Sequence, residues 1–190
     1  IQAIVNTMGV SVSAAFAVVN RIDDFAYTPE QNIAHAMTAL MAQNKGAGKI
    51  DRMKEGFRCG IILETIYGIL IFIICFALAR PLMMMFVKDE EVIGHGVTYL
   101  HLISVMYLLP ALTNGIQGFF RGIGDLKITL ISSFINMALR VLAAAPLVLI
   151  WKMGIEALPY SYLAGWIGML VAETPLLLKT YKTWGKKAGQ

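Results

Sequence analysis

The residues of this sequence best suited to chemistry are ionisable and amide side chains set inside long apolar stretches. The first stretch carries Asp23, Asp24 and Glu30, and a later one carries Arg140 with Asn136 one helical turn before it. An arginine at the centre of a membrane-spanning helix costs at least about 2.5–3.5 kcal/mol on insertion scales, so it should face protein or a water-filled cavity. Because Asn136 and Arg140 would share one helix face, they either line such a cavity or form a structural pair with a carbonyl or an acid.

The acids of the first stretch have different expected roles. Arg21 lies three residues before Asp24, so the two charges should neutralise each other on one face of a helix. Glu30 lies 13 residues before Gln43, which places it roughly 20 Å from that end of the helix. A carboxyl group at that depth suits a proton carrier, and a solvated place on a cavity wall is the alternative.

Signatures of enzymes, metal sites and nucleic-acid binding are weak in this sequence. The run 46–49 lacks the leading glycine and the Ser or Thr of a phosphate-binding loop, and the run 122–125 is too short for a dinucleotide fingerprint. The histidines at 35, 95 and 101 show no metal-ligand spacing. Basic residues lie at the ends of apolar runs rather than in a stripe with aromatics, which disfavours a nucleic-acid partner. The sequence therefore predicts neither an enzyme nor a bound cofactor or metal.

Composition places the chain in a lipid bilayer. It is 57% hydrophobic and 15% charged, whereas soluble domains carry about 25% charged residues. Five stretches are long enough to cross a hydrocarbon core of about 30 Å as helices. The sequence therefore predicts an all-α, polytopic transmembrane helical bundle with five full spans, at residues 10–42, 57–79, 92–120, 128–150 and 158–178.

Prolines and acids mark irregularities within these spans. Pro29 should kink the first span near Phe25, and the pair Arg80-Pro81 should close the second. Pro110 and Gly115 should interrupt the third span. Two further acids, Glu64 and Glu173, should face the bundle or lie near an interface.

The distribution of basic residues gives an orientation. Residues 43–58, residues 121–127 and the C-terminal tail together hold 11 Lys and Arg, whereas the opposite side holds three. Cytoplasmic loops of membrane proteins carry an excess of Lys and Arg. The C-terminus should therefore be cytoplasmic, in a multi-pass protein of the plasma (inner) membrane with lipid as its surroundings.

Three motifs resemble the multidrug and toxic compound extrusion (MATE) family of membrane antiporters. They are Gln43-Asn44-x-Gly46-Ala47-Gly48-Lys49-x-Asp51-Arg52, Phe86-x-Lys88-Asp89-x-Glu91 and Gln117-x-x-x-Arg121-Gly122-x-Gly124-Asp125. The resemblance implies two six-helix lobes around a central cavity, which exchange a drug-like organic cation for H⁺ or Na⁺. Residues 1–190 look like the C-terminal lobe, from the end of helix seven to helix twelve, with the N-terminal lobe as the missing partner.

One position departs from the family pattern. In one branch of the family, an Asp that takes part in ion coupling stands three residues before the Gln that matches Gln117, and here that position is Asn114. Another branch keeps its key acid in helix one, which this chain does not contain. The candidates for the transport cavity or for ion coupling are Glu30, Asp23, Asp24, Asn114, Gln117, Asn136 and Arg140.

Two other functions stay open. A flippase for lipid-linked oligosaccharides, from the wider exporter superfamily, should have a cationic cavity. Arg140 favours that alternative, whereas Asp23, Asp24 and Glu30 disfavour it. A membrane scaffold that transports nothing would leave the buried charges without a purpose.

Overall fold

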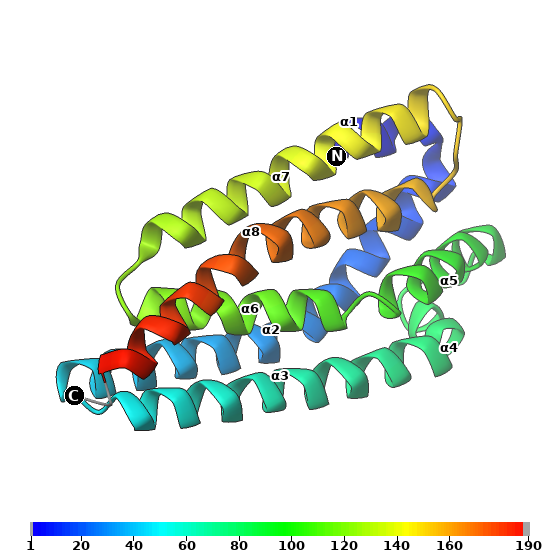
Figure 1. Ribbon diagram of the computed structural model, residues 1–190. Helices are drawn as coiled ribbons and strands as arrows, with labels where there is room; N and C mark the ends of the chain where they lie inside the picture. Colours follow the sequence, from blue (N-terminus) through cyan, green and yellow to red (C-terminus); the bar gives the residue numbers. More distant parts are fainter. Residues whose placement is uncertain (1, 188–190) are drawn as a thin grey trace.

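The computed structural model describes residues 2–187, and every regular element among them is helical (Figure 1). Two short elements open the chain, and the remaining helices form an elongated bundle. The elements are α1 (Gln2–Val5), η1 (Asn6–Met8), α2 (Val10–Gly46), α3 (Ile50–Ala77), α4 (Ala79–Met84), α5 (Glu90–Ser104), α6 (Leu108–Gly122), α7 (Leu126–Leu149) and α8 (Ala157–Lys187).

The long helices form two groups, with α6 between them. Helices α2 and α3 pack on each other and on both α5 and α6, and α7 and α8 run side by side along the bundle (Figure 1). Helix α6 contacts both α7 and α8. It therefore provides a wall that the two groups share.

Glycines set the close spacing of α2 and α6. A Cβ atom added at Gly118 would lie 2.6 Å from the Ala34 carbonyl oxygen, and one at Gly122 would lie 2.6 Å from the Thr38 carbonyl oxygen. The Thr38 hydroxyl donates a hydrogen bond of 3.1 Å to the Gly118 carbonyl. Small residues let helix backbones approach in membranes, where van der Waals packing and hydrogen bonds drive helix association.

Apolar side chains fill the interior and also cover much of the outer surface. The larger buried cluster includes Tyr99, Tyr107 and Leu158, and a smaller one includes Met53 and Phe119. Large apolar side chains on α3 and α7 are exposed, among them Ile66, Leu70, Phe134 and Met137. A surface of this kind is expected where helices face lipid rather than water.

Three helices, α3, α7 and α8 through Thr183, are long and apolar enough to cross a membrane. Helices α5 and α6 form a fourth candidate span if they are taken together, with a bend of 51° between them. Helix α2 has 37 residues but is not among these three helices. The described residues therefore support three or four spans by length and composition, and the expected count of five is not confirmed.

Two expected breaks lie elsewhere. The third span breaks at 105–107, and Pro110 and Gly115 both lie within α6. Pro110 is the third residue of α6, where the backbone N–H has no helical acceptor, so a proline costs little there. Similarly, α3 ends at Ala77, and the pair Arg80-Pro81 lies in the first turn of α4. Helix α2 continues through Pro29 as one helix.

Candidate functional site

A polar cavity of about 290 Å³ lies between α2, α6, α7 and α8. Amides, hydroxyls and aromatic rings form most of its wall, and one arginine contributes a charge. The lining residues are Tyr27, Gln31, Pro110, Thr113, Asn114, Gln117, Ser133, Asn136, Met137, Arg140, Trp166 and Met169. Four of the sequence candidates, Asn114, Gln117, Asn136 and Arg140, therefore meet at one place.

Gln117 joins three helices at this cavity. Its Nε2 atom on α6 donates a hydrogen bond of 3.3 Å to the Ser133 hydroxyl on α7, and it lies 4.0 Å from the Met169 sulfur on α8. Because Asn114 lies one helical turn earlier, both amides are on the same face of α6. The resulting α6 surface is polar although the helix is largely buried.

Arg140 is half-buried on α7 and lies over an aromatic ring. Its guanidinium carbon is 3.7 Å from the centre of the Tyr162 ring on α8, which is a cation–π geometry. Its Nε atom is buried and has no hydrogen-bond partner among the described residues. A Cβ atom at Gly165 would lie 2.6 Å from the Arg140 Cγ atom, so this glycine leaves the space that the arginine stem occupies.

The three acids of α2 do not line the cavity, and each lies in a different environment. Asp23 is buried and accepts a hydrogen bond from the Tyr107 hydroxyl. Asp24 and Arg21 are both exposed, and no ion pair joins them in the described part of the chain. The expected mutual neutralisation is therefore wrong; such exposed pairs are worth only about 0.2–0.5 kcal/mol, too little to fix two side chains.

Glu30 lies in a second polar cluster, between α2, α3 and α6. It is fully buried, and the Asn114 Nδ2 atom donates a hydrogen bond of 3.5 Å to its Oε2 atom. Glu64 on α3 is also fully buried, and its charge is close enough to act on Glu30. A Cβ atom at Gly115 would lie 3.5 Å from the Glu64 Cγ atom, which places Glu64 beside the same turn of α6.

Three of the four carboxyl oxygens in this cluster have no hydrogen-bond partner among the described residues. They are Oε1 of Glu30 and both oxygens of Glu64. Burying an isolated carboxylate is very costly, so such groups bind a proton or pair with a cation. The arrangement of Glu30 and Glu64 can therefore hold a small positive charge. The role of Glu64 could not be inferred from its own helix because its neighbours in this cluster lie on other helices.

A further buried acid, Glu173, lies on α8 close to Ser132, Gln117 and Arg121. Both of its carboxyl oxygens and the Arg121 Nε atom are without a hydrogen-bond partner in the part of the chain that the structure describes. Arg121 belongs to the third sequence motif. Its position near Glu173 places opposite charges on α6 and α8, one turn beyond the cavity.

The first and third motifs form two adjoining turns at one end of the bundle. In the α2–α3 turn, Gly48 has φ +68°, and the Lys49 backbone N–H donates a hydrogen bond of 2.9 Å to the Asn44 carbonyl. In the α6–α7 turn, Gly124 has φ +82°, a backbone region that favours glycine. The Lys45 ammonium donates to the Ile123 carbonyl and so joins the two turns. Several residues of the first motif are exposed at this end, away from the cavity: Gln43, Gly46, Ala47, Gly48, Lys49 and Arg52.

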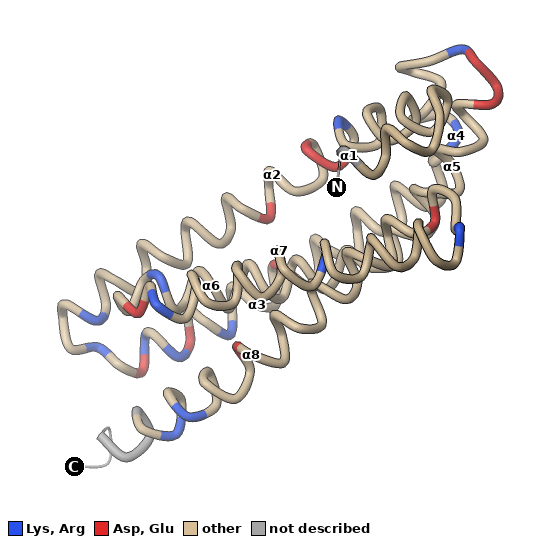
Figure 2. The backbone as a smooth tube through the Cα atoms, turned by 90° about the horizontal axis from the view of Figure 1, so that it is seen from above, with Lys and Arg blue, Asp and Glu red and all other residues tan. Residues whose placement is uncertain are grey.

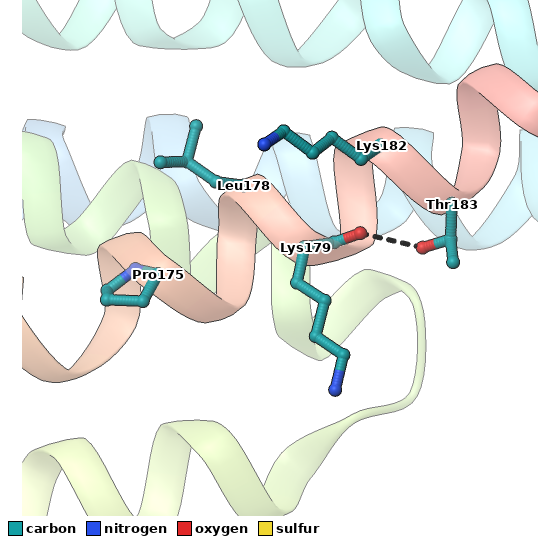
Figure 3. Close-up of a pocket in the computed structure, with 5 residues that line it drawn as sticks. All are labelled: Pro175, Leu178, Lys179, Lys182 and Thr183. Carbon is teal, nitrogen blue, oxygen red and sulfur yellow. Dashed lines mark hydrogen bonds between the residues drawn. The ribbon is translucent and has the colours of Figure 1, made fainter.

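Basic residues gather at the same end. Figure 2 shows Lys and Arg at the α2–α3 turn, at the α6–α7 turn and along the last turns of α8. A larger hollow of about 480 Å³ lies there, on the surface of α8. Figure 3 shows that Lys179 and Lys182 extend in different directions and that the Thr183 hydroxyl bonds to the Lys179 carbonyl, at 2.8 Å. These side chains do not converge on one point, so the hollow lacks the organisation of the cavity between the helices.

Comparison with known proteins identifies the family. The MatE family model matches residues 1–145. The chain belongs to the MATE family. The probable multidrug resistance protein YoeA of Bacillus subtilis strain 168 is 30% identical over 190 residues, which cover 96% of this chain and 39% of that protein. The probable multidrug resistance protein NorM of Thermotoga maritima is 24% identical, with 88% of this chain and 36% of that protein covered.

A solved structure shows the same fold. The crystal structure of a MATE protein in the bent conformation matches with a TM-score of 0.91 and 15% identity, over 96% of this chain and 41% of that one. This chain therefore has the helical membrane bundle of MATE proteins, which are transporters rather than enzymes. It spans about two fifths of the length of these relatives.

Proposed function

We propose that this MATE chain is the C-terminal lobe of an exporter that moves amphipathic drug-like molecules, organic cations among them, across the plasma membrane in exchange for H⁺ or Na⁺. The observation that carries the proposal is the polar cavity, in which Asn114, Gln117 and Asn136 meet from α6 and α7. Two relatives named as probable multidrug resistance proteins support the substrate class. In ligand pockets a few convergent polar groups fix the orientation of the ligand, and the amides of this cavity converge from α6 and α7.

Transport would use alternating access. In secondary transporters, one repeat or bundle moves against the other around a binding site near the middle of the membrane. The second, N-terminal lobe is the expected partner, since the chain covers only 39% of YoeA. The basic end of the bundle would face the cytoplasm, together with the C-terminus.

Ion coupling needs an acidic side chain that can bind and release H⁺ or Na⁺. Glu30 is the best-placed acid of this lobe because it is buried with one oxygen unpartnered and its other oxygen accepts a hydrogen bond from Asn114, which lines the cavity. The amide of Asn114 cannot itself exchange a proton near neutral pH. We place the essential coupling acid in the partner lobe, with Glu30 and Glu64 as a secondary site.

One observation favours the flippase alternative. Among the described residues that line the cavity, Arg140 carries a positive charge, and the acids of α2 are not part of the lining. A cationic wall is what a carrier of lipid-linked phosphate would need. The alternative therefore stays as the second candidate.

The test is efflux of a cationic dye, ethidium, from vesicles that contain the full-length protein. We expect efflux when an H⁺ or Na⁺ gradient is imposed and none without it. Gln117→Leu should lower the efflux rate, because it removes the amide that joins three cavity helices, whereas Gln43→Leu in the exposed turn should not. Efflux independent of any ion gradient, or an equal effect of both variants, would contradict the proposal.

A further inference from the structure

The wall of the cavity has one charge, and it is positive. Among the described lining residues, Arg140 is the ionisable group that carries charge near neutral pH, and the others are amides, hydroxyls, aromatic rings, thioethers and a proline. Asp23, Asp24 and Glu30, which would attract an organic cation, are absent from that lining set. The charge of this wall therefore favours an anionic group of a ligand, and the acids that would attract a cationic group lie outside the lining.

Arg140 also lacks an anionic partner. The ion pairs found among the described residues join other side chains, namely Lys54 to Asp51, Arg80 to Glu90 and His95 to Glu91. The guanidinium lies on the Tyr162 ring, and its Nε atom is buried without a hydrogen bond. A guanidinium has five N–H donors and no acceptor, so an aromatic face leaves most of its hydrogen-bonding capacity unused.

Asp23 is the nearby acid, but its carboxyl group is engaged elsewhere. It accepts the Tyr107 hydroxyl, and it forms no ion pair with Arg140 within 4 Å. The Arg140 guanidinium is thus available to a ligand in the cavity.

The rest of the cavity wall could bind the apolar body of an anionic ligand. The rings of Tyr27 and Trp166 lie 6.5 Å apart at 61° on the α2 and α8 sides. Asn136 lies one turn before Arg140 and adds a neutral amide. Aromatic faces take flat apolar bodies, and an arginine fork with an adjacent amide takes a carboxylate or phosphate.

We propose that this cavity binds amphipathic molecules through an anionic group, a carboxylate or a phosphate, held by Arg140 with the apolar body against Trp166 and Tyr27. This inference rests on the proposed transport function and specifies part of its substrate class. It applies to acidic and zwitterionic drugs and equally to anionic lipid. The cavity of about 290 Å³ fits one ring system or one headgroup rather than a whole large ligand.

The experiment measures binding rather than transport, so its outcome is independent of ion coupling. Fluorescein and rhodamine 123 share a xanthene body, and near neutral pH the first is an anion and the second a cation. Their affinities for the full-length protein in an uncharged maltoside detergent are measured by fluorescence anisotropy. We expect fluorescein to bind more tightly, and Arg140→Gln to weaken its binding about 10- to 100-fold, as for loss of a hydrogen bond to a charged group.

Matched variants separate this effect from damage to the fold. Arg21→Gln makes the same change at an exposed arginine of α2 and should leave fluorescein affinity unchanged. Asn136→Asp places a carboxylate one turn from Arg140 without removing the arginine, and it should weaken fluorescein binding and strengthen rhodamine 123 binding. Asp23→Asn removes the nearby acid and should leave the preference for fluorescein in place or increase it.

A lipid arm identifies the source of the anionic group. Adding phosphatidylglycerol to the micelles should displace fluorescein if the cavity accepts lipid phosphate. It should have no effect if the cavity accepts only soluble anions. In both cases Arg140→Gln should abolish the preference for fluorescein over rhodamine 123. Tighter binding of rhodamine 123 to the unmodified protein would overturn the proposal. So would equal fluorescein affinity in Arg140→Gln and Arg21→Gln. Ethidium efflux can persist in any of these cases, so failure here leaves the transport function standing.

Discussion

Replacing Gly118 with alanine would place a methyl group where α2 and α6 already touch. The new Cβ atom would lie 2.6 Å from the Ala34 carbonyl oxygen and 3.2 Å from the Ala34 Cα atom. Both are backbone atoms, which cannot rotate away, so the two helices must separate by several tenths of an ångström. A gap of about 0.5–1 Å forfeits a quarter to a half of the dispersion energy of the contacts involved.

The magnitude follows from two opposing effects. Overpacking of this kind costs about 1–3 kcal/mol, and separation also strains the bond from the Thr38 hydroxyl to the Gly118 carbonyl, now 3.1 Å. Alanine is favoured over glycine in a helix by about 1 kcal/mol. Gly94 in α5 offers a matched control, because a Cβ atom added there meets nothing within 4 Å. Gly94→Ala keeps the propensity gain alone, and that gain is common to both variants, so their free energies of unfolding should differ by the overpacking cost of about 1–3 kcal/mol.

The assay is thermal unfolding of the full-length protein in detergent, followed by a thiol-reactive or intrinsic fluorescence signal. We expect Gly118→Ala to unfold at a lower temperature than the unmodified protein, and Gly94→Ala at the same or a higher temperature. If both variants shift in the same direction by the same amount, the close approach of α2 and α6 does not limit stability, and this account of their packing is refuted.

Three further predictions concern topology and transport. In a protein whose Cys59 and Cys75 are replaced, a cysteine at position 89 should react with an impermeant reagent added outside and one at position 49 should not; the reverse pattern would invert the orientation. Residues 1–190 alone, in vesicles with an imposed ion gradient, should show no ethidium efflux because a cavity between lobes needs both; robust efflux would mean that this unit is complete. Glu30→Gln in the full-length protein should lower efflux modestly and leave its dependence on pH, measured across a pH series, in place; loss of that dependence would move the coupling acid into this lobe.

Part of the helix order was predictable because the ends of some apolar runs coincide with the ends of helices. The expected fourth span at 128–150 corresponds to α7 at Leu126–Leu149, and the expected start of the fifth span at 158 corresponds to the start of α8 at Ala157. Apolar length and interfacial turn residues act locally, so one sequence contains the necessary information. Recognition of the family from three motifs is confirmed by the family model.

The breaks and the contacts between helices were not predictable in the same way. The break in the third span was expected at Pro110, but the bend lies at 105–107. Pro110 lies in the first turn of α6, where a proline does not interrupt the helix. The Tyr107 hydroxyl and the Asp23 carboxyl meet across 84 residues, and so do Asn114 and Glu30. Such pairs depend on the rotation and axial shift of each packed helix, which the periodicity of a single helix does not determine.

The cavity shows both sides of this limit. Asn136 and Arg140 were expected on one helix face from their spacing alone, and both line the cavity. Tyr162 and Trp166, four residues apart on α8, were not singled out, although a tyrosine and a tryptophan at that spacing share a helix face. The spacing within α8 does not show that this face packs against α7, where Tyr162 meets Arg140.

The short turn between α6 and α7 has a mechanical consequence. Only residues 123–125 join these helices, and at the same end the Tyr181 hydroxyl on α8 bonds to the Lys54 carbonyl on α3, at 3.1 Å. At the far end, Ile155 in the turn before α8 and Leu158 in α8 are buried in the larger apolar cluster. If the α7–α8 pair tilted about the basic end, then over the 24 residues of α7, roughly 36 Å, a tilt of about 10° would displace the opposite end by about 6 Å. The lever length of α7 thus converts a small change of angle into an opening as wide as a drug-sized ring.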